Sequence, residues 1–207
     1  MSFEIEKYPL SQESKTLLQE TALLKSLREQ DPNAFKNLVE TFQDKVFNTC
    51  FGFLHNSEDA EDMAQETFVE IYQSIDKFRG EAQLSTWIYR IAVTKSLEYL
   101  RRKKRKKRFG FLQPIFSNEE VEQVNKLSDF QHPGISLENK ERSQILFAAI
   151  DTLAENQKIA FTLHKVEGLS HEKISEIMDL SISSIESLMF RAKKNLQKRL
   201  ENYYKSS

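Results

Sequence analysis

Apolar residues recur every three to four positions along most of this chain, which is the spacing that places them on one face of an α-helix. Phe35, Leu38 and Phe42, for example, follow one another at this spacing. No segment shows the alternation and turn residues of a β-hairpin. The pattern predicts helical segments over residues 11–30, 32–54, 57–75, 85–108, 137–168, 170–178 and 181–200.

Residues that favour the ends of helices stand at most of the predicted boundaries. Asp31 followed by Pro32 predicts an N-cap with proline at the first helical position. Gly168 predicts a C-cap, and Asp179 predicts a turn in the left-handed geometry that Asp accepts better than most residues. Further N-caps are predicted at Ser57, at Ser85 or Thr86, and at Ser181.

The helical pattern stops between residues 109 and 138, where glycine and proline are scattered among Ser and Asn. A connection of this length is well beyond ordinary loops and predicts a flexible linker. We therefore expect an all-α fold of two small helical domains, an N-terminal helical bundle and a C-terminal helix-turn-helix domain. The predicted divisions are an N-terminal extension (1–20), the first domain (21–108), the linker (109–138) and the second domain (139–207).

The composition agrees with a helical protein, because only five Gly and four Pro occur among 207 residues. The one cysteine, Cys50, lies in an apolar segment and predicts a buried residue in a reducing compartment. No apolar run approaches the ~20 residues of a membrane span, and Glu4, Glu6 and Lys7 stand where a signal peptide would be apolar. We expect a soluble, cytoplasmic protein without membrane insertion.

Histidines are few and scattered, at positions 55, 132, 164 and 171, and they form no metal-ligand pair on one helix face. The sequence also lacks a glycine-rich loop of the kind that cradles phosphate. Both observations argue against an enzyme. We expect no catalytic residue, no metal and no cofactor.

Charge is distributed unevenly, although the formal net charge is only −1. Residues 56–70 hold six acids and no base, whereas residues 101–108 are eight consecutive Lys and Arg. Like charges in such runs repel one another and require solvent or an oppositely charged partner. The separation predicts two partners, a polyanion such as nucleic acid and a cationic protein surface.

Aromatic and basic residues are interleaved before and along the helical segment that ends in this basic run. Proteins bind single-stranded nucleic acid by combining stacking surfaces with a cationic track. The alternative is that Trp87 is ordinary core and that the basic run is a solvated helix end or a localisation signal. The candidate DNA-binding residues are Phe78, Arg79, Trp87, Tyr89, Arg90, Arg101, Arg102, Lys103 and Lys104.

The last two helical segments form a helix-turn-helix pattern. Ile185, Leu188 and Met189 mark the packed side of the second helix, and its early exposed positions carry polar side chains. The N-terminal residues of a recognition helix reach base edges in the major groove. A plain antiparallel helix pair is the alternative. We predict base contacts by Ser183, Ser184, Glu186 and Ser187, and phosphate contacts by Arg191 and Lys194.

Two blocks of the sequence resemble a known family. The first is DAEDMAQETFVEIY, residues 59–72, which continues to FRGEAQLSTWIYRIA, residues 78–92. The second is LSHEKISEIMDLSISSIESLMFRAKKNL, residues 169–196. They are similar to the second and fourth regions of bacterial RNA polymerase sigma factors of the extracytoplasmic-function (ECF) group. With their flanking helices they cover most of residues 24–203.

The resemblance implies that the chain binds core RNA polymerase, recognises and melts promoter DNA and starts transcription. The segment from Phe78 to Arg102 would melt and hold the promoter element nearer the start site, and the helix-turn-helix would bind the upstream element. Thr94, a further candidate DNA-binding residue, stands where the family often has Asn, so capture of the base there would differ. The linker would follow the RNA exit path, and an anti-sigma factor would be a further partner. The acidic helix would dock on the clamp of the largest catalytic subunit through Asp59, Asp62, Gln65, Glu66 and Phe68.

A stand-alone helix-turn-helix regulator is the main alternative, because its DNA-binding half would look the same. An inhibitory adaptor that only sequesters a partner is a third class. The acidic helix and the aromatic loop argue against the regulator, which needs neither, and the basic run argues against the adaptor.

Overall fold

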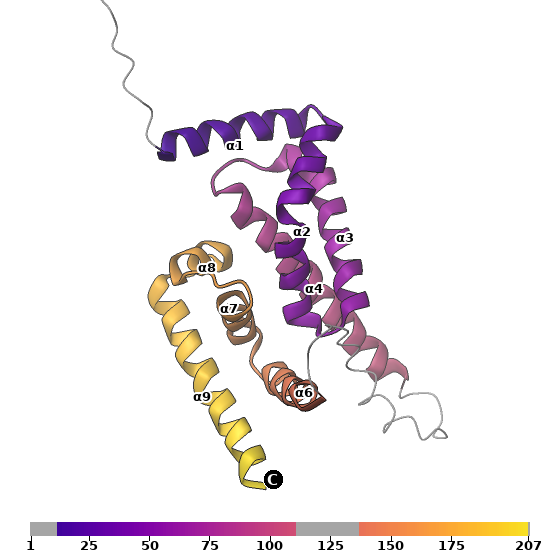
Figure 1. Cartoon of the computed structure of the whole chain (residues 1–207), viewed down its shortest axis with the longest axis vertical. Helices are drawn as coiled ribbons and strands as arrows, with labels where there is room; N and C mark the ends of the chain where they lie inside the picture. Colours follow the sequence, from indigo (N-terminus) through magenta and orange to yellow (C-terminus); the bar gives the residue numbers. More distant parts are fainter. Residues whose placement is uncertain (1–11, 111–136, 207) are drawn as a thin grey trace, which may run out of the picture.

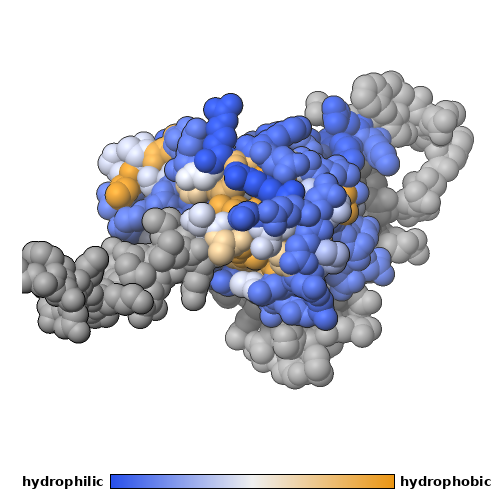
Figure 2. Space-filling view, turned by 90° about the horizontal axis from the view of Figure 1, so that it is seen from above, coloured by the Kyte–Doolittle hydropathy of each residue, from blue (hydrophilic) through white to orange (hydrophobic). Residues whose placement is uncertain are grey.

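The computed structural model describes residues 12–110 and 137–206, and the regular elements in these two ranges are all helices. Figure 1 shows two groups of helices that lie against each other. Seen from the α1 end, the surface is mostly hydrophilic, with small hydrophobic patches between the polar residues (Figure 2). The all-α prediction is therefore confirmed for the described residues.

The first group is built on three long helices that pack against one another, α2, α3 and α4. Its core contains Leu38, Phe53, Ile71 and Ile88, each nearly or fully buried. The amphipathic spacing in the sequence buries these residues because only one face of each helix is apolar. The elements are α1 (Gln12–Arg28), α2 (Pro32–Leu54), α3 (Ser57–Ser74), the short 3-10 helix η1 (Ile75–Lys77) and α4 (Leu84–Gly110).

Two of the predicted helix starts in this group are correct in place, but only one has the predicted capping residue. Asp31 caps α2 as predicted, since its side chain accepts a hydrogen bond from the Asn33 N–H at 2.9 Å. The cap of α3 is Asn56 instead of Ser57, and its side chain accepts from the Asp59 N–H at 2.8 Å. Asn56 is the last residue with extended backbone, so its side chain is the one that reaches the free N–H groups.

The start of α4 also differs from the prediction of a cap at Ser85 or Thr86. The helix begins at Leu84, and Thr86 is fully buried within its first turn. The Leu84 N–H donates to the carboxylate of Glu20, which belongs to α1. A side chain from another helix therefore caps α4.

The second group contains α6 (Leu137–Asp151), α7 (Glu155–Lys165), α8 (His171–Met178) and α9 (Ile182–Ser206). The sequence pattern predicted one helical segment over residues 137–168. The structure has two helices there, because the helical backbone is interrupted between Asp151 and Glu155. The predicted C-cap at Gly168 is wrong in position, because α7 ends at Lys165 and Gly168 lies in the following loop with φ +65. Asp179 does adopt the left-handed conformation, with φ 53 and ψ 48, and it turns the chain between α8 and α9.

The two groups share one continuous core, because buried residues of α7, α8 and α9 belong to the same apolar cluster as those of the first group. Helix α7 contacts α2, and α8 contacts α4 (Figure 1). The predicted linker, 109–138, lies almost wholly outside the described residues, as does most of the predicted extension, 1–20. None of the described helices is both long and apolar enough to cross a membrane.

Candidate nucleic-acid and protein interfaces

The exposed face of α3 carries acids and apolar side chains together. Of the predicted docking residues, Asp62, Gln65 and Glu66 are exposed, whereas Phe68 is half-buried against the core. Two apolar residues on this helix, Val69 and Tyr72, are 51% and 47% exposed. Asp62, Glu66 and Val69 follow one another at four and three residues, and Tyr72 comes three residues after Val69. This spacing was visible in the sequence, but it resembles the spacing of core residues, and the two exposed apolar positions were missed.

Asp59, the fifth predicted docking residue, is engaged within the chain. Its carboxylate accepts hydrogen bonds from the Tyr99 hydroxyl at 2.5 Å and from Lys103 Nζ at 2.9 Å, and its side chain is 20% exposed. Burial of Tyr99, together with this bond to Asp59, raises the pKa of the phenol to about 12. Asp59 therefore joins α3 to the basic end of α4.

The loop between η1 and α4 presents its charged residues and hides its aromatic one. Phe78 is 5% exposed and packs on Trp87, with 5.0 Å between ring centroids. Arg79 is exposed beside Glu81, with 3.8 Å between the charged groups, and Gly80 adopts φ +75. Of the aromatic surfaces predicted for stacking, Phe78 is thus covered in this structure, whereas Trp87 is half-buried.

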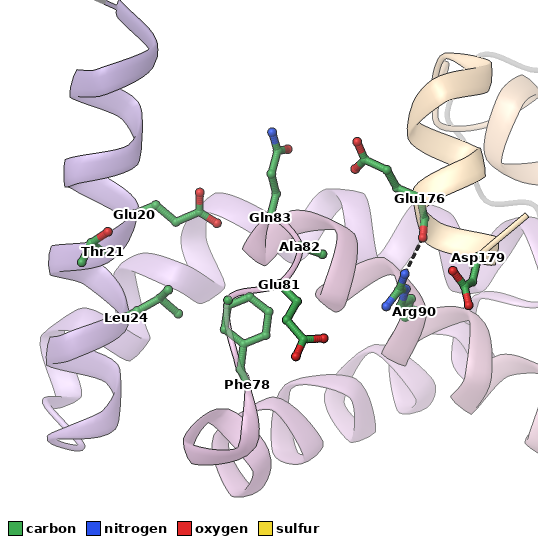
Figure 3. A pocket seen from close by; sticks show the side chains of 11 residues that line it. Glu20, Thr21, Leu24, Phe78, Glu81, Ala82, Gln83, Arg90, Glu176 and Asp179 are labelled. Carbon is green, nitrogen blue, oxygen red and sulfur yellow. Dashed lines mark hydrogen bonds between the residues drawn. The ribbon is translucent and has the colours of Figure 1, made fainter. Parts of the chain in front are cut away.

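The face of α4 that follows this loop lies under the second group of helices. The Tyr89 hydroxyl donates to Glu167 Oε2 at 3.1 Å, and Tyr89 is 5% exposed. Arg90 donates to the backbone carbonyls of Ile177 at 3.1 Å and Glu176 at 2.5 Å, at the end of α8 (Figure 3). Two predicted DNA-binding residues are therefore occupied by contacts with the second group.

A neighbouring part of α4 stays open. A surface hollow of about 370 Å³ is lined by Trp87, Thr94, Lys95 and two acids, Glu70 and Glu98, among others. The Thr94 hydroxyl donates to the Arg90 carbonyl at 2.7 Å within the helix. An aromatic wall beside hydrogen-bonding groups is an arrangement that can hold an unstacked base.

The basic end of α4 is only partly available for a polyanion. Arg101 pairs with Glu155 of α7 at 2.5 Å, and Lys103 pairs with Asp59. Arg102 and Lys104 are exposed and line a second hollow with Arg105. Their charges face solvent, where they can meet DNA phosphates.

The recognition helix α9 is arranged as predicted. The Ser181 side chain caps it by accepting from the Ser184 N–H at 3.3 Å, and Ile185, Leu188 and Met189 are buried. Phe190, which the prediction missed, is 68% exposed at the spacing that continues the polar stripe of the helix. An aromatic residue in a helix is ordinarily expected in the core. Only the polar residues one turn before Phe190 could have indicated that it is exposed. The predicted DNA-binding residues that are exposed or half-exposed here are Ser183, Ser184, Glu186, Ser187, Arg191 and Lys194.

A polar cluster joins the end of α2 to α6 and α7. Lys158 is 6% exposed and donates to Asp151 Oδ1 at 2.5 Å and to the Phe53 carbonyl at 3.0 Å. His55 is buried and lies with its ring against that of Phe147, with 4.1 Å between centroids. Burial acts to raise the pKa of Asp151, but hydrogen bonds from His55 and Lys158 outweigh it and the pKa is lowered. This cluster holds the two groups together in addition to the contact between α4 and α8.

Comparison with known proteins agrees with this architecture. The profile of sigma-70 region 2 matches residues 38–106, and that of sigma-70 region 4 matches residues 143–196. The chain is 34% identical over 185 residues to the ECF RNA polymerase sigma-E factor of Haemophilus influenzae, covering 89% of this chain and 96% of that protein. It is 32% identical over 184 residues to the sigma-E factor of Escherichia coli K12, covering 89% and 95%.

Two solved structures share the fold. The structure of CnrH in complex with the cytosolic domain of CnrY has a TM-score of 0.61 at 17% identity, covering 88% of this chain and 97% of that one. The sigma factor RpoE of Bartonella quintana, solved in complex with the anti-sigma factor NepR, has a TM-score of 0.57 at 20% identity, covering 81% and 96%.

These helices and surfaces define a sigma-70-type transcription initiation subunit, which is a class without catalytic function of its own. Within that class the chain belongs to the ECF sigma factors of RNA polymerase. As a member of this family it partners with core RNA polymerase and promoter DNA and directs promoter-specific initiation.

Proposed function

We propose a division of labour among three surfaces of this sigma factor. The exposed face of α3 docks on the polymerase clamp through Asp62, Gln65 and Glu66. The loop and open face of α4 hold the melted promoter element, and α9 reads the upstream element in the major groove. All of this takes place in the cytoplasm, where transcription is initiated, and the chain has no enzymatic step of its own.

The mixed surface of α3 carries this proposal. Val69 and Tyr72 are about half exposed beside Asp62 and Glu66, so apolar contact area and negative charge lie on one helix face. Exposed apolar residues among charges are typical of a protein interface, and the acids would select a cationic partner surface. A stand-alone regulator has no use for such a face.

On α9 the division follows the distance from the start of the helix. Ser183, Glu186 and Ser187 lie in the first two turns, where base edges are within reach. Arg191 and Lys194 come one to two turns later, where they meet flanking phosphates. On α4, the exposed Arg102 and Lys104 add phosphate contacts that hold the duplex without reading it, whereas Arg101 and Lys103 would first have to leave their ion pairs with Glu155 and Asp59.

An inhibitory protein partner is a further part of the proposal. Both solved structures with the same fold are complexes with a second protein, and one of those partners is named an anti-sigma factor. In this chain the exposed α3 face is the natural target for such an inhibitor, because covering it would block polymerase docking.

Reconstitution with purified core RNA polymerase tests the proposal. The chain should form a stable complex with core enzyme, select promoters from a random-sequence DNA library and start transcripts from them. Binding of selected DNA by the free chain, with no association with core enzyme, would instead identify a stand-alone regulator.

A further inference from the structure

Helix α1 forms hydrogen bonds with both ends of the loop that leads into α4. The Arg28 guanidinium donates to the Phe78 carbonyl at 2.6 Å, where the loop begins. The Glu20 carboxylate accepts from the Leu84 N–H, where the loop ends and α4 starts. These two residues of one helix are therefore attached to the first and last peptide groups around Arg79–Gln83.

The contact at Leu84 supplies something that α4 lacks. The first turn of α4 contains no acidic residue, and its predicted cap residues lie inside the helix. The first N–H groups of a helix have no partner within it, and they carry partial positive charge. Glu20 provides both the acceptor and the negative charge, from a position 64 residues earlier in the chain.

The loop itself is conformationally permissive at its second residue, so contacts at its two ends limit the shapes that it can adopt. Gly80 adopts φ +75, a conformation that other residues rarely adopt, and the Phe78 N–H is bonded to the Ile75 carbonyl at 3.1 Å. Leu24 of α1 lines the same cavity of about 530 Å³ as Phe78 and Gln83 (Figure 3). Between these two hydrogen-bonded ends, Arg79 and Glu81 are exposed.

We propose that Glu20 and Arg28 are positioning residues for promoter opening, because they hold the 79–83 loop in the shape that captures a melted base. The proposal rests on the function proposed above for this loop. Helix α1 precedes the residues matched by the region 2 profile, which begins at residue 38. The N-terminal helix thereby becomes part of the DNA-opening machinery without touching DNA.

The test uses full-length chain assembled with core RNA polymerase on a duplex promoter selected by the unmutated holoenzyme. A fluorescent base analogue in the downstream element reports strand opening. The variants are Glu20→Ala and Arg28→Ala, with Glu20→Gln and Arg28→Lys as conservative partners that keep an acceptor or a donor. Glu29→Ala is the matched control, since Glu29 is an exposed acid just after α1 whose ion pair is with Lys25 of that helix.

Loss of the cap by Glu20, or of the hydrogen bond from Arg28 to the Phe78 carbonyl, corresponds to about a fivefold change in an equilibrium, so opening should be about fivefold weaker in each Ala variant. The conservative variants should recover most of it, and Glu29→Ala should match the unmutated protein. Affinity for core enzyme should stay unchanged. Amide hydrogen exchange at Leu84 should accelerate in Glu20→Ala alone among the three Glu variants.

Unchanged opening by Glu20→Ala and Arg28→Ala would overturn the proposal, and so would equal loss of core affinity and opening, which would indicate general destabilisation. Failure of the proposed function gives a different result, because the unmutated holoenzyme would then open no selected promoter. Exchange at Leu84 measures the cap in either case, and slow exchange in Glu20→Ala would by itself contradict the assignment.

Discussion

Glu167 is the side chain that is least well satisfied where the two groups of helices meet. Its Oε2 accepts the Tyr89 hydroxyl, whereas Oε1 is buried without a hydrogen-bond partner among the described residues. Burial raises the pKa of Glu167 to about 6, although Tyr89 and the positive charge of Lys45 act to lower it. Burial of Tyr89, with the nearby carboxylate, raises the pKa of that phenol. The ionised form of Glu167 is therefore less stable in this buried position than in water.

Glu167→Gln should make stability less dependent on pH. A carboxyl group with a raised pKa in the folded protein stabilises it fully below its ordinary pKa of about 4.5, and this contribution is lost as pH rises through about 6. The variant should thus gain thermal stability relative to the unmutated protein as pH rises from about 5 to about 7.5. Thermal unfolding across this range measures the difference.

Glu172→Gln is the control for that experiment. A hydrogen bond from Ser170 lowers the pKa of Glu172, so replacing this residue removes a contribution that is present above pH 4.5. Glu172→Gln should therefore lower thermal stability by the same amount throughout the range from about pH 5 to about 7.5, with no change in slope. A Glu167→Gln curve parallel to that of the unmutated protein would show that Glu167 ionises as it does in the unfolded chain.

Phe190 should contribute to base preference. Its ring is 68% exposed on α9, between the predicted base-reading residues and Arg191, and apolar side chains read the thymine methyl group. Phe190→Ala should change the preference at one upstream position by about 1–3 kcal/mol, whereas Arg191→Ala should lower affinity for all sequences alike. Holoenzyme binding to upstream duplexes with every base substituted singly separates the two effects. The reverse assignment of effects would place α9 differently in the groove.

At the scale of a helix, the acids on the exposed face of α3 should determine whether the chain binds core RNA polymerase. Asp62→Lys combined with Glu66→Lys should abolish association with core enzyme while the fold survives, because both side chains face solvent. A pull-down of core enzyme, with circular dichroism as the folding check, measures this. Glu29→Lys combined with Glu40→Lys changes the same charge at exposed side chains beside α1 and on α2 and should bind normally. Equal binding by both double variants would rule out the docking assignment.

The basic end of α4 should contribute salt-dependent affinity without sequence preference. Replacing Arg102 and Lys104 with Gln should flatten the dependence of promoter affinity on salt, by a slope of about 1 for each DNA phosphate that these side chains neutralise. Arg101→Gln should have less effect, because Arg101 is paired with Glu155 in this structure. Promoter affinity measured at several salt concentrations gives this slope. If the variant has the same slope as the unmutated protein, these side chains do not contact DNA and the segment is a solvated helix end.

Helical periodicity located most of the described helices, because an apolar face is a pattern local in the sequence, but it merged α6 and α7 into one segment. The capping of α4 could not be predicted, since Glu20 is 64 residues away from Leu84. The same limit applies to the candidate DNA-binding residues. Phe78 and Tyr89 have the composition of a stacking surface, but long-range contacts bury both of them. Their roles, like those of the other candidate residues, stay predictions.

At the scale of the whole molecule, the second group of helices buries Tyr89 on α4 and bonds to the exposed Arg90 beside it. Contact between the two groups of helices also depends on a close approach of α2 to α7. A Cβ atom at Gly52 would lie 2.6 Å from Thr162 Cγ2 and 3.2 Å from Val166 Cγ2, and Thr162 is only 2% exposed. Glycine at this position is therefore what lets the helices meet.

Gly52→Ala should push the two groups of helices apart without weakening α2, because Ala favours a helix by about 1 kcal/mol over Gly. Small-angle X-ray scattering should report a larger radius of gyration for the variant. Adding Thr162→Ser removes the methyl group that clashes and should restore much of the compact form. A Gly52→Ala protein as compact as the unmutated one would show that the helices adjust around the added methyl group.

The covering of α4 also has a consequence for the order of synthesis. The covering helix α8 follows α4 in the chain, so the ribosome completes α1 to α4 before α8 exists. Helix α4 ends at Gly110 and α8 ends at Met178, so 68 residues separate the two ends, and at about 5–20 residues per second they take about 3 to 14 s to make. During that interval the nascent chain contains all of α1 to α4, while Tyr89 and Arg90 have not yet met Glu167, Glu176 and Ile177, their partners in the second group.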